Sequence, residues 1–347
     1  MRLFAKLLAS HPYSYDILCA EARKDIPPHY RAAVWSALLG VDADEARDAF
    51  TRLDTFAEHP SDRQLNVDIP RCHQYDELMT SPAAHHKLKI MLKAWLMDTT
   101  NAGTGYVYWQ GLDSLAAPFL VLNFNNVAVA FQCLRAFIER FLHNFFLQDN
   151  TEVIQGLKIL QLKIHSSFSS LSFFQDYLTL FMLLVEFIDP ELASHLYALE
   201  FLPQLFAIPW FLTCFAHVLP FHKLFHLWDA LLSADASFPL FIGMAILVQL
   251  RSRLIKAQFN DAILLFSDLP DLSIDRVVDD SQKFYNSVPA SCTHEVEHKG
   301  ARHCTRDLRA LLVQLIASSS RVASSRVKTS TKRSSVTSRI SETSNVA

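Results

Sequence analysis

The sequence predicts an all-α protein with a large apolar core. Half of its 347 residues are hydrophobic and only 19% are charged, so the chain can bury enough surface for one or two domains. Leucine and phenylalanine outnumber valine and isoleucine, and only seven glycines occur, which favours helices over sheets. Apolar residues also recur at helical spacing along nearly the whole chain.

The first part of the chain contains four predicted helical stretches. Residues 2–22 predict an N-terminal helix, within residues 1–24, that packs on the main domain. Pro27 and Pro28 suit the first turn of the next helix, which contains residues 31–39 and ends at Gly40. Further helices are expected over residues 44–56 and 85–97, the second with a leucine-rich face.

Two connections in this part are predicted from proline and glycine. Residues 66–70 should be extended, because Pro70 disfavours helical geometry at Ile69. Residues 98–105 are polar and contain two glycines, so they should form a loop that leads into residues 106–111.

The second part continues as helices rich in phenylalanine and leucine. Residues 112–147 should form helices that are interrupted at 123–126. Further helices are expected over residues 174–187, 190–201, 210–218, 221–232, 239–257 and 260–266. The sequence has no internal repeat and no heptad seam, so it predicts no particular oligomeric state.

Composition also bounds the environment and the partners. Two windows, residues 114–134 and 201–222, lack charge for about 20 residues, but their prolines and polar groups favour buried helices over membrane spans. Six scattered cysteines form no disulfide framework, and Lys6 interrupts the first apolar run, so a cytoplasmic protein without a signal peptide is expected. The net charge of −3 predicts no general affinity for nucleic acid.

The C-terminal end differs from the rest. Residues 286–317 predict a partly helical segment of poorly defined fold, and residues 318–347 contain fifteen Ser or Thr, six Lys or Arg and no aromatic residue. This composition is typical of a disordered tail. The tail is either a solvated end without function or a basic segment for peripheral contact with anionic endomembranes.

Two short strings carry the chemistry. Arg71 follows Pro70, and Asp68 lies three residues earlier, where it could hold the guanidinium. Gln110 precedes Gly111, where the backbone can come close to a partner. An arginine that neutralises charge on a γ-phosphate and a glutamine that orients water are the two groups that a slow GTPase lacks. Each signal alone is weak, since most such residues are surface ion pairs or solvated amides.

Five motifs in order strengthen this interpretation. They are residues 26–40 (with Arg31 and Trp35), 65–71, 108–111, 208–215 and 227–232. Together they resemble the TBC domain, the Rab GTPase-activating family, over roughly residues 25–285. Three strings, residues 68–78, 108–115 and 124–126, are most similar to TBC proteins that also carry kinase-like and rhodanese-like parts. The chain contains no kinase motif, so we expect those parts to be absent from it.

The resemblance implies a V-shaped domain of more than a dozen helices, with a groove for the switch regions of a GTP-bound Rab. It implies that Arg71 reaches the γ-phosphate and that Gln110 positions the hydrolytic water. Asp68, Asp113, Tyr108 and Gly111 would support these two fingers, and Arg31 would brace the fold. GTP and magnesium would belong to the Rab, so no cofactor and no metal of the chain's own are expected.

Alternatives remain open at this point. The domain could bind GTPases as a non-catalytic adaptor, or the chain could be a membrane-embedded helical protein. A defective gene product is a further alternative, which the unusual segment 156–176 would support. Residues 156–176 look like extra sequence relative to the family, either a tolerated loop or translated non-coding sequence. A cluster that includes Cys292, His294 and Cys304 offers zinc ligands, but its spacing fits no common zinc finger.

Overall fold

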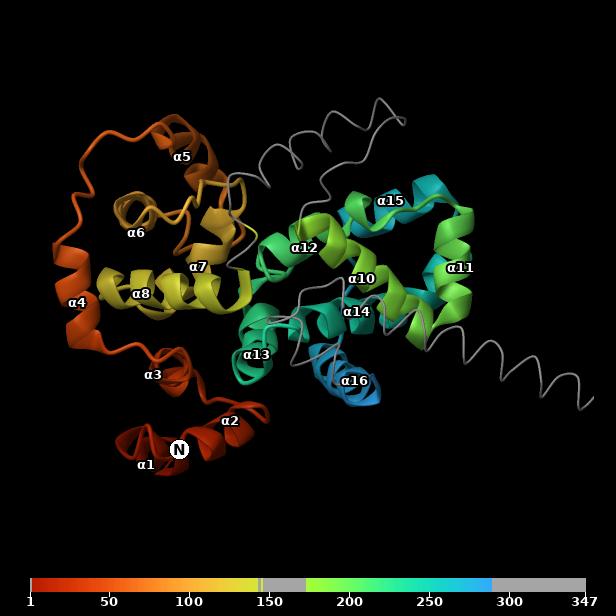
Figure 1. The fold of residues 1–347 in the computed structure, drawn as a ribbon, viewed down its shortest axis with the longest axis horizontal. Helices are drawn as coiled ribbons and strands as arrows, with labels where there is room; N and C mark the ends of the chain where they lie inside the picture. Colours follow the sequence, from red (N-terminus) through yellow and green to blue (C-terminus); the bar gives the residue numbers. More distant parts are fainter. Residues whose placement is uncertain (1, 143–144, 146–172, 289–347) are drawn as a thin grey trace, which may run out of the picture.

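The computed structural model describes residues 2–142, 145 and 173–288 (Figure 1). Helices account for all its regular structure, and the described part contains no strand. The prediction of an all-α fold is confirmed. The predicted tail, the Cys/His cluster and residues 156–172 of the expected insertion lie outside the described residues.

The helices form two groups that lie side by side in Figure 1. The first group comprises α1 (Arg2–Ala9), α2 (Tyr15–Ala22), α3 (Pro28–Leu38), α4 (Ala43–Thr51), α5 (Asp62–Asp68), α6 (Pro82–Ala102), α7 (Leu112–Leu122) and α8 (Val127–Phe137). The second comprises α10 (Phe173–Ile188), α11 (Pro190–Ala198), α12 (Ala207–Leu212), α13 (Phe221–Leu232), α14 (Phe238–Leu254), α15 (Phe259–Ser267) and α16 (Ile274–Ser287). Three short elements complete the set: η1 (Ile69–Arg71), η2 (Ile138–Leu142) and η3 (Pro203–Leu205).

Several boundaries differ from those predicted. The helix expected over residues 2–22 is two helices, and the Ser14 hydroxyl at the junction donates to the Leu7 carbonyl at 2.6 Å. Helix α6 is longer than expected, because Ser81 caps its first turn and Gly103, with φ of 62°, ends it. Helix α16 was not predicted as such.

The prediction of an extended segment over residues 66–70 is wrong. Helix α5 runs to Asp68 and continues into η1, and Ile69 has helical φ and ψ of −53° and −46°. Helical spacing buries Leu65, Asp68 and Ile69 on one side, and this burial outweighs the local preference of a residue before proline. Pro70 lies in the first turn of η1, where a proline leaves no donor unpaired.

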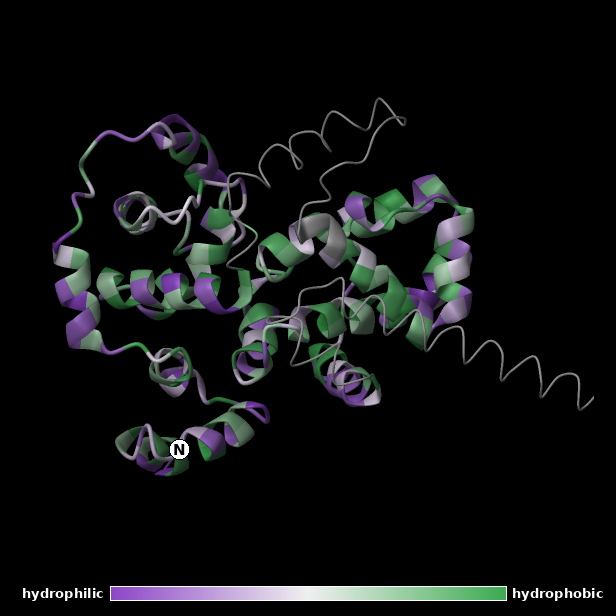
Figure 2. Ribbon diagram, viewed as in Figure 1, coloured by the Kyte–Doolittle hydropathy of each residue, from purple (hydrophilic) through white to green (hydrophobic). Residues whose placement is uncertain are grey.

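Buried rings and apolar helices hold the groups together. Helix α14 is almost wholly buried and hydrophobic, whereas α16 beside it is largely hydrophilic on the outside (Figure 2). At the junction of the two groups, the Trp228 ring of α13 lies 5.6 Å from Trp35, 5.2 Å from Phe119 and 4.6 Å from Phe137, between ring centroids. Helix α13 therefore packs on α3, α7 and α8 at once. In the described part, no helix is both long and apolar enough to cross a membrane.

An ion pair lies beside this aromatic cluster. The Arg31 guanidinium donates to both carboxylate oxygens of Asp229, at 2.9 to 3.1 Å, and to the Ile26 carbonyl at 3.0 Å. The Trp35 indole donates to the same carboxylate at 2.7 Å. Arg31 is 9% exposed and Asp229 is 1% exposed, so the pair is shielded from water. Its position between α3 and α13 agrees with the bracing role expected for Arg31.

Replacement of Arg31 by Met should therefore destabilise the fold strongly. The variant leaves a buried carboxylate without its counter-charge, and we expect the free energy of unfolding to fall by about 3–5 kcal/mol. Urea unfolding measures the effect. Arg47→Met is the matched control, because it removes an exposed ion pair with Asp44 and should cost at most about 1 kcal/mol. Equal losses in the two variants would contradict a bracing role.

Candidate functional site

A hydrogen bond joins the two segments that carry Arg71 and Gln110. The Tyr108 hydroxyl donates to Asp68 Oδ2 at 2.9 Å, and the side chain of Gln64 donates to Asp68 Oδ1 at 2.8 Å. Asp68 is the last residue of α5, and its burial leaves it 5% exposed. The carboxylate thus fixes the end of α5 to the loop before α7, across forty residues of sequence.

Arg71 ends η1 and is exposed. It forms no hydrogen bond or ion pair with any residue that the structure describes. The expected pairing of Asp68 with Arg71 is therefore wrong for this structure, because the helical path turns Asp68 inward toward Tyr108. The guanidinium remains available to a partner.

Gln110 is also exposed, and the residue after it explains the local conformation. Gly111 has φ of 108° and precedes the first turn of α7. A Cβ atom at this position would lie 3.0 Å from Thr213 Cγ2, which is tighter than nine in ten real Cβ contacts. The backbone N–H of Gly111 donates to Asp113 Oδ1 at 3.1 Å. Only glycine satisfies both the dihedral angle and the close approach.

Buried acidic groups lie beneath these two segments. Asp113 is 5% exposed, and burial, together with the nearby charge of Asp68, raises its pKa. Burial also raises the pKa of the Tyr108 phenol, which stays neutral and can donate to Asp68. Burial likewise raises the pKa of the Cys72 thiol. Asp68, Asp113 and Tyr108, which the resemblance implied as supporting residues, lie close together here. Cys72 was not predicted as part of this group, because only the tertiary structure brings it beside Asp113.

A second polar chain, which the sequence analysis did not single out, connects the site to the second helix group. His73 Nε2 lies 3.2 Å from the Ser114 carbonyl oxygen, and the Tyr75 hydroxyl lies 3.0 Å from His73 Nδ1. The Ser114 hydroxyl lies 3.2 Å from His217 Nδ1. His73 is buried and has φ of 46°, a left-handed conformation that is uncommon for residues other than glycine.

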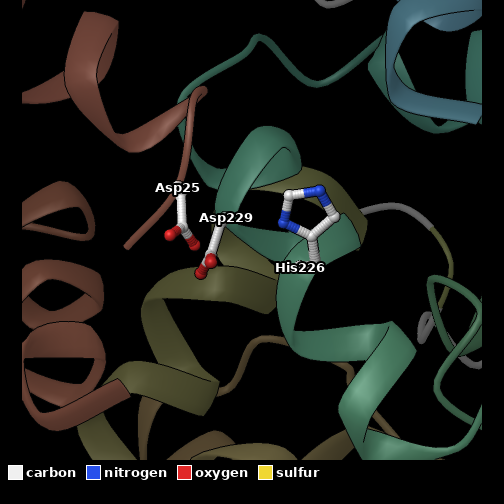
Figure 3. A group of neighbouring side chains, drawn as sticks. All are labelled: Asp25, His226 and Asp229. Atoms are coloured by element: carbon white, nitrogen blue, oxygen red, sulfur yellow. The ribbon is translucent and has the colours of Figure 1, made fainter. Parts of the chain in front are cut away.

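A group of three titratable residues includes Asp229 of the Arg31 ion pair. Asp25, His226 and Asp229 place ligand atoms within 4.8 Å of one another (Figure 3). However, Asp229 already accepts hydrogen bonds from Arg31 and Trp35, and the guanidinium would repel a cation. His226 Nε2 also lies 3.0 Å from Asp275 Oδ1. These contacts favour a structural role for the group.

Comparison with known proteins places this geometry in a family. Residues 28–255, more than half of the chain, match the family model described as the Rab-GTPase-TBC domain. The chain belongs to this family. The TBC domain fold itself is recovered at low sequence identity: the Ypt/Rab-GAP domain of Gyp1p has a TM-score of 0.60 at 18% identity, and covers 78% of this chain and 91% of that structure. A Chlamydomonas flagellar RabGAP TBC domain gives 0.57 at 17% identity, with 78% of this chain and 84% of that structure covered.

More similar relatives confirm the narrower resemblance. The TBC domain-containing protein kinase-like proteins of Gallus gallus and Homo sapiens are 50% and 49% identical to this chain over 292 residues. In both cases, the alignment covers 84% of this chain and 30% of the relative. The chain therefore spans about three-tenths of the length of the curated relatives that it matches.

A side chain at Gly111 should destabilise the fold, because of the close approach to Thr213. Gly111→Ala combines an unfavourable φ with a contact against Thr213, whereas Gly105→Ala, at φ of 73°, meets nothing within 4 Å. We expect the free energy of unfolding to fall further in Gly111→Ala than in Gly105→Ala, by about 1–3 kcal/mol. Urea unfolding of both variants provides the comparison, and an equal loss would show that the contact with Thr213 is unimportant.

The buried imidazole of His73 should make the TBC domain sensitive to acid. Burial lowers the pKa of His73 from 6.5 to about 4, so its contribution to stability is complete above pH 6.5 and is lost as the pH falls toward 4. The predicted loss is up to about 3 kcal/mol, at 1.36 kcal/mol per pKa unit. His73→Asn tolerates the left-handed backbone and should remove this part of the pH dependence.

The measurement is the free energy of unfolding of wild type and His73→Asn between pH 4 and pH 8. His86→Asn, an exposed change near the start of α6, serves as the control and should keep the wild-type pH dependence. Parallel curves for wild type and His73→Asn would contradict the assignment.

Proposed function

We propose that this chain stimulates GTP hydrolysis by a Rab small GTPase. Membership of the Rab-GTPase-TBC domain family supports the class of partner. One observation carries the finer proposal: Arg71 and Gln110 are both exposed, on two segments that the Tyr108–Asp68 hydrogen bond joins. Such a pair could enter the nucleotide site of a docked protein together.

In this mechanism, the GTP and its magnesium ion belong to the Rab. Arg71 stabilises the charge that spreads over the γ-phosphate oxygens in the transition state, and Gln110 orients the attacking water. Asp68 and Tyr108 hold the two segments in register, while Asp113 and Gly111 set the turn that presents Gln110. The two side chains need no proton transfer of their own, because their work is positioning and electrostatic stabilisation.

The second candidate is an adaptor that binds a GTP-loaded Rab without accelerating hydrolysis. The relatives' names describe kinase-like proteins of which this chain spans about three-tenths, so the domain could serve mainly to recruit a partner. The exposed Arg71, which has no partner in the described part of the chain, favours the catalytic proposal.

We also propose a setting for this activity. A Rab acts on membranes in vesicle trafficking, so the chain would work in the cytoplasm and at the surface of endomembranes. The basic residues 318–347 could supply peripheral contact with anionic lipid.

Arg71→Ala should nearly abolish stimulation of a responsive Rab. An arginine finger contributes on the order of 10³–10⁵ in rate, which corresponds to about 4–7 kcal/mol of barrier. Affinity for the GTP-loaded Rab should change far less, because the finger acts mainly in the transition state. Single-turnover GTP hydrolysis across a Rab panel measures the stimulated rate. Titration with a Rab that is loaded with a non-hydrolysable GTP analogue measures the affinity.

Arg63→Ala is the matched control, because Arg63 is also an exposed arginine and lies in α5, which continues into η1. Gln110→Ala tests the second finger in the same assay. Retention of full stimulation by Arg71→Ala would refute the proposed role. Nucleotide-dependent binding without stimulation across the whole panel would instead establish the adaptor.

A further inference from the structure

The turn between α12 and α13 meets the start of α7 at an unusual backbone conformation. Cys214 and Phe215 have φ of 42° and 70°, so two consecutive non-glycine residues adopt left-handed geometry. Such residues are strained, and they persist where the surrounding structure determines them, often at functional sites. The turn is held by the Phe215 N–H, which donates to the Trp210 carbonyl at 2.7 Å.

The strained turn directs two side chains toward the segment that carries Gln110. Thr213 is 2% exposed, and its Cγ2 atom makes the close approach to Gly111. Its hydroxyl donates to the Pro209 carbonyl at 2.7 Å and accepts from the backbone N–H of His217 at 3.1 Å. Thr213 is therefore fixed on the turn, and it also sets the position of His217.

Ser114 is where three parts of the molecule meet. Its carbonyl oxygen lies 3.2 Å from Nε2 of His73. His73 is the second residue after Arg71 in the sequence. Its hydroxyl lies 3.2 Å from His217 Nδ1, on the turn from the second helix group. Ser114 itself is the third residue of α7, the helix that begins directly after Gln110 and Gly111. The side chain of His217 thus reaches the first turn of the helix that Gln110 precedes.

We infer that His217 is a positioning residue for Gln110, acting through Ser114. The hydrogen bond holds the first turn of α7 against the second helix group, and it limits the motion of the turn that presents the carboxamide. Displacement of reacting groups by about 1 Å can cost on the order of 10²-fold in rate, so a modest loosening should be measurable. This inference rests on the proposed function, since it assigns His217 a part in the same site.

Three variants test the contact. His217→Ala removes the imidazole, Ser114→Ala removes the hydroxyl, and His217→Asn keeps a polar atom near the position of Nδ1. His195→Ala is the control, because it removes another imidazole contact of 3.2 Å, to the Ala257 carbonyl in the second helix group. Exposure of His217 to solvent makes a folding defect in its variants a minor concern.

Hydrogen exchange of the free protein gives the first readout. We expect His217→Ala and Ser114→Ala each to speed exchange of the backbone amides in residues 106–115 several-fold. The double variant that combines the two changes should exchange no faster than either single variant. His217→Asn and His195→Ala should leave these amides as in wild type. Unchanged exchange in His217→Ala would overturn the inference, whether or not the chain stimulates a GTPase.

The second readout is stimulated GTP hydrolysis by a responsive Rab. His217→Ala should lower kcat about tenfold, the equivalent of one hydrogen bond, while KM for the GTP-loaded Rab stays within twofold. His217→Asn should restore kcat. A loss confined to KM would overturn the positioning role and indicate a docking residue. If wild type stimulates no Rab, the proposed function fails while the exchange measurement still decides the contact.

Discussion

The buried ion pair of Arg31 and Asp229 is the interaction on which the arrangement of the two helix groups depends. It connects α3 with α13, and the Trp35 indole shares the same carboxylate. A buried carboxylate is costly unless its oxygens are satisfied, and here the guanidinium and the indole together satisfy both. Because the pair is directional, it fixes the rotation of α13 against α3, which apolar packing alone would leave less defined.

This constraint extends to the candidate site through the aromatic cluster. Trp228 directly precedes Asp229 in the sequence, and its ring packs on rings of α7 and α8. Its indole also donates to the carbonyl of Cys214 at 2.8 Å, on the left-handed turn. The same helix therefore orients the core and supports the turn that contacts Gly111. The position of Gln110 therefore depends on the packing of the aromatic cluster around Trp228.

The site combines rigid support with exposed tips. Asp68, Asp113 and Tyr108 are buried or partly buried and hydrogen-bonded, whereas Arg71 and Gln110 reach solvent. This division suits a protein that acts on a group carried by a partner. The support can be organised before the partner arrives, which lowers the entropy lost on docking, and the tips remain accessible.

Sequence alone determined the fold class, the family and the residues worth testing. Helical periodicity and scarce glycine predicted an all-α chain, and five motifs in order placed it in the TBC family, because each motif combines a packing requirement with a fixed spacing. Gly111 stood out in the sequence as a place where the backbone could approach a partner, whereas the close approach that the structure shows is to Thr213.

Only the tertiary structure decided how those residues are connected. Asp68 pairs with Tyr108 and not with Arg71, because burial of Leu65 and Ile69 continues the helix through a segment that Pro70 suggested would be extended. The meeting of His73, Ser114 and His217 depends on segments about forty and one hundred residues apart, which no local pattern reveals. Local spacing encodes which face of a helix is buried, but the partner of a buried polar group is set by the packing of distant elements.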